Sequence, residues 1–90
     1  MTVAEKLVAL LKAQGLTCAT AESCTGGGVG SAITAVPGSS AVFAGGVISY
    51  ANEVKRDVLG VSADILQNVG AVSAETAAQM AEGARRLLKV

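Results

Sequence analysis

The N-terminal segment has the apolar spacing of an amphipathic helix. Its apolar residues recur three or four positions apart, at Val3, Leu7, Leu10 and Leu11. Thr2 and Glu5 have the spacing of a capping box just ahead of this run. Gly15 follows the run, and glycine is common directly after the end of a helix. The pattern therefore predicts a helix over residues 2–14.

Two later segments have the composition of buried strands. Residues 16–22 (LTCATAE) are short, mostly apolar and rich in small and β-branched types. Residues 42–50 (VFAGGVISY) form the second such segment. Gly45 and Gly46 lie inside it, and paired glycines in a strand predict a bulge or a close approach of another backbone.

The segment between these strands predicts a turn followed by a helix. Residues 23–28 (SCTGGG) form the turn, and residues 29–35 form a helix that Pro37 and Gly38 close. The predicted order up to the second strand is thus helix, strand, turn, helix, strand.

Three helices are predicted after the second strand. Asn52 is a suitable N-cap for a helix over residues 53–59, and Ser62 caps another that runs to Asn68. Ser73 caps the last helix. Its expected apolar face consists of Ala77, Met80, Ala81, Ala84 and Leu88. Its expected polar face consists of Glu75, Gln79, Glu82, Arg86 and Lys89.

The predicted elements leave the sheet incomplete. Four or five helices accompany only two strands, and a sheet of two strands is marginal on its own in water. The chain also ends at RRLLKV, which contains no helix C-cap signal. We therefore expect more chain or a second copy to complete the layer, and we predict a homo-oligomer.

Composition limits the partners of the chain. Its 90 residues make one domain at most, and with 51% hydrophobic but only 2% aromatic residues its core must be built by close packing of small side chains. Seven basic and seven acidic residues cancel, so nothing favours binding to nucleic acid or to an anionic membrane surface. The sequence has neither a secretory signal pattern nor a long apolar run, and the expected location is the cytoplasm.

The absence of histidine removes several classes of catalyst. A triad with a histidine base and a histidine-ligated metal site are both excluded for this chain alone. Cys18 and Cys24 are the only cysteines, and we expect both thiols to be free. We predict neither a metal nor a cofactor.

The segment AESCTGGG, residues 21–28, is the strongest candidate for a site. It lies where a strand is followed by a helix, and unpaired backbone N–H groups at such a junction can bind an anion or a developing oxyanion. The alternative is that Ser23 or Thr25 only caps the helix and the glycines only form the turn. The segment fits neither a dinucleotide fingerprint nor a P-loop, because Ser31 stands at the third glycine position and no lysine follows the glycines.

Lys55 is the candidate base for a Ser23 nucleophile. It falls in the first turn of the helix after Asn52, where the positive end of the dipole disfavours a cation by about 0.3–1 kcal/mol. A partly desolvated lysine can accept the proton of a serine hydroxyl. The alternative is a solvated surface lysine. Tyr50 could direct its hydroxyl into the same cleft, or could pack in the core with only its tip exposed to water.

Several motifs together resemble the CinA C-terminal domain family, which includes nicotinamide-nucleotide amidases. They are AESCTGG at 21–27, VPGSSAVFAGGVISYANEVK at 36–55, LGV at 59–61 and GAVS at 70–73. The resemblance implies a three-layer α/β/α fold with a mixed sheet, incomplete in this chain. It also implies hydrolysis of the carboxamide of nicotinamide mononucleotide to nicotinate mononucleotide and ammonia.

The resemblance also implies roles for individual residues. Ser23 matches the nucleophile, Lys55 matches the base, and Tyr50 matches a further position in the site. The residues implied to bind substrate are Glu22, Cys24, Thr25, Gly26, Gly27 and Asn52. The competing interpretation is an inactive or partner-dependent fragment that binds a nucleotide phosphate without catalysis.

The sequence departs from the family pattern at three places. Family members usually carry a bulkier apolar residue in place of Gly28, and Ser or Thr in place of Ala51. Family domains are also roughly twice as long as this chain. They continue with a strand and a VTGIAGP-like loop that lines the site, and the sequence contains neither.

Overall fold

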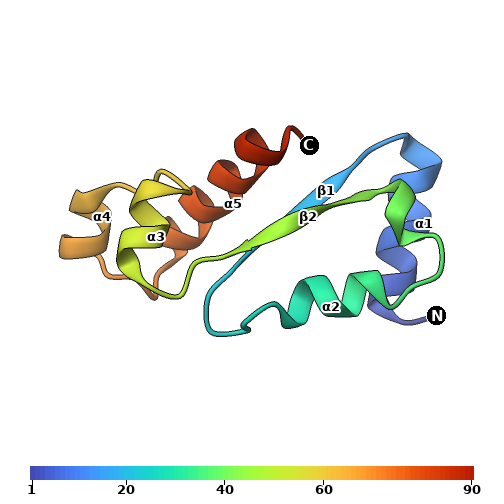
Figure 1. The fold of residues 1–90 in the computed structure, drawn as a ribbon, viewed down its shortest axis with the longest axis horizontal. Coiled ribbons are helices and arrows are strands. Elements are labelled where there is room, and N and C mark those ends of the chain that lie inside the picture. Colours follow the sequence, from blue (N-terminus) through green and yellow to red (C-terminus); the bar gives the residue numbers. More distant parts are fainter.

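The computed structural model describes all residues from 1 to 90. The chain folds as helices around one small sheet (Figure 1). The elements are α1 (Val3–Gln14), β1 (Cys18–Glu22), α2 (Gly28–Thr34), the short 3-10 helix η1 (Ser39–Ala41), β2 (Phe43–Ile48), α3 (Asn52–Asp57), α4 (Ala63–Asn68) and α5 (Ala74–Leu88).

Helix α1 has the predicted caps but buries only part of the predicted apolar face, at Leu7 and Leu11. The Thr2 hydroxyl accepts a hydrogen bond from the Glu5 N–H at 3.1 Å, and the Glu5 carboxylate accepts one from the Thr2 N–H at 2.9 Å. Val8 is the fully buried residue of this helix, whereas Val3 and Leu10 are exposed. The prediction of a buried Val3 and Leu10 was wrong, because α1 turns Leu7, Val8 and Leu11 towards the apolar cluster that it shares with α2 and the start of β2.

The two strands are parallel and form the whole sheet. Both are shorter than predicted. A shift in register between Cys18 and Ala19 leaves Ala44 as an extra residue in β2, just before Gly45. At Gly46, a β-carbon would collide with the Thr20 hydroxyl of the facing strand. The paired glycines therefore mark both a bulge and a close approach, as predicted.

Helices cover both faces of the sheet, which gives three layers. On one face, Ala21 and Val47 pack against a buried cluster formed by Leu59, Val61, Met80 and Ala84. On the other face, α2 lies over Thr20, Glu22 and Phe43. A second apolar cluster joins α1, α2 and the start of β2, and its buried members are Val8, Ile33 and Val42. The α/β class predicted from the sequence is confirmed.

Helix α5 is rotated relative to the predicted apolar face. Its buried residues are Thr76, Met80, Gly83 and Ala84. Ala77 and Ala81, predicted to be buried, are exposed. The reason is a close contact of Gly83 with the main chain of Leu59, which leaves no room for a side chain and fixes the side of α5 that faces the core. The helix also has a C-cap that the sequence analysis did not anticipate, namely Lys89 at φ 57°.

Helix α3 begins and ends earlier than predicted. Ala51 is its N-cap, with extended backbone angles and no capping side chain, and Asn52 is its first helical residue. The Ala51 carbonyl accepts hydrogen bonds from the N–H groups of Val54 and Lys55. The predicted N-cap role of Asn52 was therefore wrong by one residue. The predicted caps of the next two helices, Ser62 and Ser73, are confirmed.

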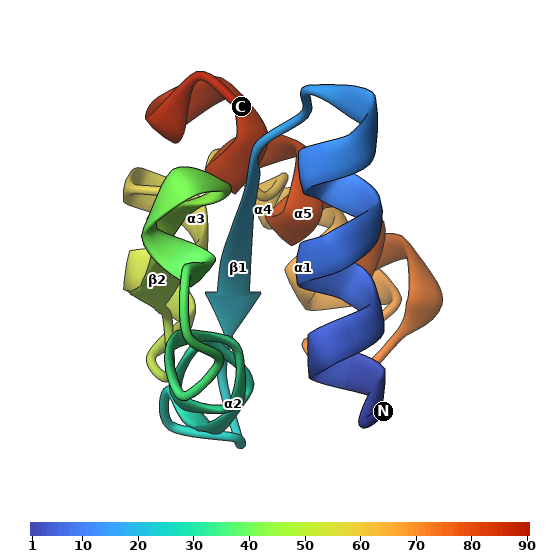
Figure 2. The ribbon, with the colours of Figure 1, turned by 90° about the vertical axis from the view of Figure 1, so that its right-hand side faces the viewer.

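The molecule is elongated, with dimensions of 40 × 22 × 17 Å. The strands run along its length, with α3 and α4 at one end and α1 at the other (Figure 1). Figure 2 views the molecule from the α1 end, where the N-terminus also lies. Only 13 of 90 residues are buried. Seven of them form two separate apolar clusters, of four and three residues. No helix combines the length and the apolar character needed to cross a membrane.

Candidate active site

Ser23 and Lys55 come together at the carboxyl ends of the two strands. Ser23 directly follows β1, and Lys55 lies in α3, which begins four residues after β2 ends. The Lys55 amine is 3.2 Å from the Ser23 hydroxyl, within hydrogen-bond reach although the two residues are 32 positions apart in the chain. The predicted contact between the two side chains is therefore present.

Lys55 is buried, and all of its hydrogen bonds are made inside the chain. Only 3% of its surface is exposed. Besides the contact with Ser23, its amine donates to the main-chain carbonyls of Ser49 at 2.7 Å and Tyr50 at 2.9 Å. The alternative of a solvated surface lysine is thereby contradicted. Two carbonyls hold the tetrahedral nitrogen so that its remaining position is directed at the Ser23 oxygen.

No carboxylate compensates the charge of this lysine. The ion pairs of the chain are Arg56 with Asp57 and Glu82 with Arg85 and Arg86, all of them exposed. A charged amine that is buried without a carboxylate partner is costly. The polar contacts of this amine are the Ser23 hydroxyl and the carbonyls of Ser49 and Tyr50.

Glu22 anchors the turn that carries Ser23. One carboxylate oxygen accepts hydrogen bonds from the Thr25 hydroxyl at 2.8 Å and the Val29 N–H at 2.9 Å. The other accepts from the Thr20 hydroxyl at 3.0 Å and the Gly30 N–H at 2.9 Å. Glu22 is 5% exposed and has no oxygen without a partner. We therefore revise its predicted role from a substrate contact to an internal anchor.

The pKa of Glu22 reflects these four contacts. Burial alone would raise the pKa of its carboxyl group, but the hydrogen bonds from Gly30, Thr25, Val29 and Thr20 outweigh burial. Together they lower the pKa from 4.5 to about 2. Glu22 is thus an anion at neutral pH, and it occupies the N-terminus of α2.

The turn leaves fewer free N–H groups than the sequence predicted. Val29 and Gly30 would be the anion-binding groups of the α2 N-terminus, but both donate to Glu22. Within the chain, the N–H groups of Cys24, Thr25 and Gly27 have no hydrogen-bond partner. An oxyanion could therefore bind at the turn itself and not at the end of the helix. Left-handed backbone angles at Gly26 (φ 59°) and Gly27 (φ 102°) shape this turn.

The remaining predicted residues lie around this pair with different exposures. Cys24 and Thr25 are exposed on the turn, and Asn52 is exposed at the start of α3. The Tyr50 side chain is 78% exposed, and it is the Tyr50 carbonyl that contacts Lys55. Neither of the two structural alternatives for Tyr50, a hydroxyl in a cleft or a ring in the core, describes its position.

Ser49 is a site residue that the sequence analysis missed. It is fully buried, and its N–H and hydroxyl both donate to the Glu22 carbonyl, at 2.6 and 3.1 Å. Its own carbonyl holds Lys55. The one signal in the sequence was a serine within the otherwise apolar end of the segment VFAGGVISY.

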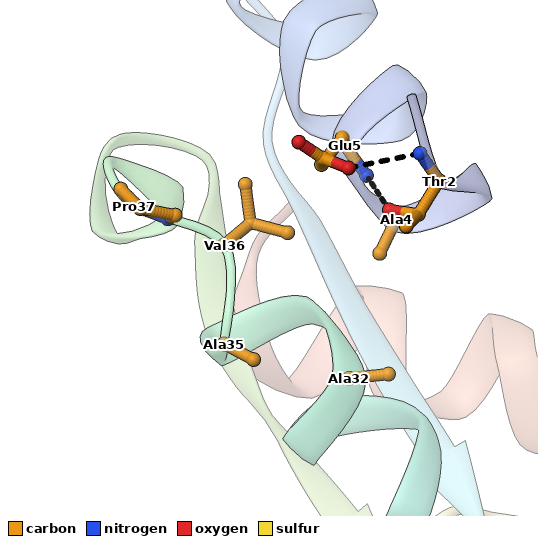
Figure 3. A pocket seen from close by; sticks show the side chains of 7 residues that line it. All are labelled: Thr2, Ala4, Glu5, Ala32, Ala35, Val36 and Pro37. Carbon is orange, nitrogen blue, oxygen red and sulfur yellow. Dashed lines mark hydrogen bonds between the residues drawn. The ribbon is translucent and has the colours of Figure 1, made fainter.

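The site lies outside the main cavities. None of the five main cavities is lined by Ser23 or Lys55. The largest, of about 380 Å³, separates the start of α1 from the end of α2 (Figure 3). Its lining residues are Thr2, Ala4, Glu5, Ala32, Ala35, Val36 and Pro37. A cavity of about 170 Å³ between α2 and the sheet includes Glu22.

Both cysteines are free thiols, as predicted. Burial raises the pKa of Cys18, which keeps that thiol protonated at neutral pH. No group of three or more His, Cys, Asp and Glu side chains is arranged to hold a metal ion.

The fold and this site define an α/β protein with a buried lysine beside a serine at the strand ends. The CinA C-terminal domain family matches residues 1–90, so the chain belongs to that family. A CinA-like protein from Parasynechococcus marenigrum is 59% identical over 87 residues, which are 97% of this chain and 21% of the relative. Another from Synechococcus sp. strain RCC307 is 56% identical, with the same coverage.

Solved structures show the same fold. The competence/damage inducible protein CihA from Agrobacterium tumefaciens is 47% identical, with a TM-score of 0.88, over 92% of this chain and 50% of that one. A CinA superfamily protein from Enterobacter cloacae is 33% identical, with a TM-score of 0.94, over 97% of this chain and 52% of that one. The chain thus spans about a fifth of the curated relatives and half of the structural neighbours.

Proposed function

We propose that this chain contributes the nucleophile and the base of an amidase that acts on nicotinamide mononucleotide. The observation that carries the proposal is the 3.2 Å contact between Ser23 and a buried Lys55 that two carbonyls orient. Buried serine–lysine pairs are known nucleophile–base combinations. The substrate comes from the resemblance of the family motifs and from membership in the CinA C-terminal domain family.

In this mechanism, Lys55 acts as a neutral amine. Its two N–H groups stay on the carbonyls of Ser49 and Tyr50, and its lone pair accepts the Ser23 proton as the oxygen attacks the carboxamide carbon. The negative charge on the carboxamide oxygen is stabilised by the free N–H groups of the turn, at Cys24 and Thr25. Lys55 then returns the proton to the departing nitrogen, and ammonia leaves.

The second half of the reaction restores the enzyme. Water attacks the acyl carbon on Ser23 while Lys55 takes a proton from that water, and Lys55 then gives this proton to the Ser23 oxygen as the ester bond breaks. The products are nicotinate mononucleotide and the free hydroxyl of Ser23.

The second candidate is a partner-dependent fragment that binds the nucleotide phosphate without catalysis. Two observations favour it. The turn beside Ser23 is exposed to solvent, and the chain covers only about half of the solved relatives. Its phosphate would bind the free N–H groups at Cys24, Thr25 and Gly27, since Glu22 already occupies the α2 N-terminus.

Incubation with nicotinamide mononucleotide separates the two candidates. The amidase proposal expects ammonia release that disappears in Ser23→Ala and falls by about 100-fold or more in Lys55→Met. Glu82→Gln, on the exposed face of α5, is the matched control and should release ammonia at the rate of the unaltered chain. Binding of the nucleotide without ammonia release supports the fragment. Release that persists in Ser23→Ala contradicts the assignment of the nucleophile.

A further inference from the structure

Glu22 contacts the surroundings of both Ser23 and Lys55. Its side chain binds the turn that carries Ser23, and its main-chain carbonyl reaches Lys55 through Ser49. The side chain faces α2, where its oxygens hold Thr25 on the turn and the first N–H groups of the helix. Ser23 lies between Glu22 and Thr25 in the chain. The position of the serine therefore depends on contacts made by the residues on either side of it.

The main-chain carbonyl of Glu22 is linked to Lys55 through Ser49. It accepts both the N–H and the hydroxyl of Ser49, at 2.6 and 3.1 Å. The Ser49 carbonyl accepts the Lys55 amine at 2.7 Å. A single residue at the end of β1 is thus one bond from the serine and two hydrogen bonds from the lysine.

We propose that Glu22 is the positioning residue of the site, a buried carboxylate that keeps the Ser23 hydroxyl within reach of Lys55 without touching substrate. This inference rests on the proposed function, because it concerns the geometry of the same pair. It also accounts for a carboxylate buried beside a site whose proposed chemistry does not use it.

Glutamine cannot replace Glu22 at this position. Each carboxylate oxygen accepts one backbone N–H, from Val29 and from Gly30. An amide has a single acceptor oxygen, so its NH₂ group would face one of those N–H groups. The two threonine hydroxyls can rotate to accept, but a backbone N–H cannot. Glu22→Gln therefore loosens the turn by a nearly isosteric change.

The position of the pair can be read without turnover from the ¹⁵N resonance of the Lys55 amine. Ser23→Ala removes its hydroxyl partner and should move the resonance. Glu22→Gln should move it in the same direction, while Glu82→Gln should leave it in place. If Glu22→Gln does not fold, Thr25→Val decides the question, since Thr25 is exposed and its hydroxyl is one of the contacts of the turn. An unmoved resonance in the folded variant overturns the proposal.

A double-mutant cycle tests whether Glu22 acts through the pair. Acylation of Ser23 by p-nitrophenyl acetate transfers the acetyl group to the oxygen, releases p-nitrophenolate and moves the hydroxyl proton to Lys55. Lys55→Met should slow this step by about 100-fold. Glu22→Gln should slow it by about 10-fold or more, because small displacements of reacting groups reduce rates strongly. In the Glu22→Gln variant, Lys55→Met should lower the acylation rate by a factor several-fold smaller than in the unaltered chain.

The outcomes distinguish the two claims. If Lys55→Met has no effect on acylation in the unaltered chain, the proposed function fails. The positioning role of Glu22 is then tested only by the ¹⁵N resonance of the Lys55 amine. If Lys55→Met slows acylation, and the double variant is slowed by the product of the factors for Lys55→Met and Glu22→Gln, then Glu22 acts only on stability. That result overturns the positioning role. Losses that fail to multiply, together with a shifted resonance, support the positioning role.

Discussion

The Ser23 hydroxyl and the Lys55 amine lie 3.2 Å apart at the carboxyl ends of two parallel strands. Both strands end at the same edge of the sheet because they are parallel, so the residues that follow them meet there. The pairing of β1 with β2 is therefore what creates the site, even in a chain that contains only these two strands.

Ser23→Ala should remove turnover while leaving substrate affinity largely unchanged. The hydroxyl forms a bond in the reaction and contributes little to ground-state binding. The measurement is ammonia release, with binding by calorimetry, in a chain extended by the second half of a homologous domain. Unchanged turnover would show that another group or an activated water attacks the carboxamide.

Tyr50→Phe should change stability by no more than about 0.5 kcal/mol and should leave the Lys55 contact intact. The side chain is 78% exposed, and the contact with Lys55 is made by the main-chain carbonyl, which the substitution retains. Urea unfolding and the Lys55 ¹⁵N resonance measure the two effects. A displaced resonance would mean that the hydroxyl takes part in the site, as the resemblance implies.

Glu22 should make stability depend on pH in the acid range. Its pKa is about 2 in the folded chain, below the ordinary value of 4.5. A lowered pKa means that the carboxylate contributes stability above about pH 4.5, and that this contribution is lost as pH falls towards 2. Urea unfolding at a series of pH values should show the gap between the unaltered chain and Glu22→Gln closing over this window. A gap that stays constant down to pH 2 contradicts the role of the ionised carboxylate, and Glu82→Gln serves as the exposed control.

Gly83→Ala should destabilise the chain by about 1–3 kcal/mol, although alanine is the better helix former. A β-carbon at this position would collide with the main-chain carbonyl of Leu59, which cannot move aside as a flexible side chain could. The matched control is Gly28→Ala, where the nearest atom is 4.0 Å from the added carbon. Thermal or urea unfolding compares the two variants. Equal stability for both would show that α5 does not pack closely on Leu59.

The chain should be an oligomer in solution. Each strand of the two-stranded sheet has one edge without a partner strand, and Val29, Ile48 and Tyr50 expose apolar surface beside the site. The formal net charge is zero, which leaves little repulsion between copies. Sedimentation velocity at micromolar concentration measures the state directly. A compact monomer that unfolds cooperatively would contradict this expectation.

Local features of the fold could be predicted from the sequence. The capping box of α1, the caps Ser62 and Ser73, the bulge beside Gly45 and the order of elements depend on neighbours within a few positions. Such short-range hydrogen bonds and backbone preferences are the same wherever the segment lies. The family motifs further indicated Ser23 and Lys55 as a pair.

Long-range contacts were decided only by the tertiary structure. The exposure of Leu10 and Ala81 depends on which elements pack against them, and no local pattern contains that information. The same holds for Glu22, whose carboxylate takes the N–H groups that the sequence assigned to a ligand. The sequence determined which groups could do chemistry, whereas packing determined which of them face one another, because hydrogen bonds at buried positions are settled by neighbours far away in the chain.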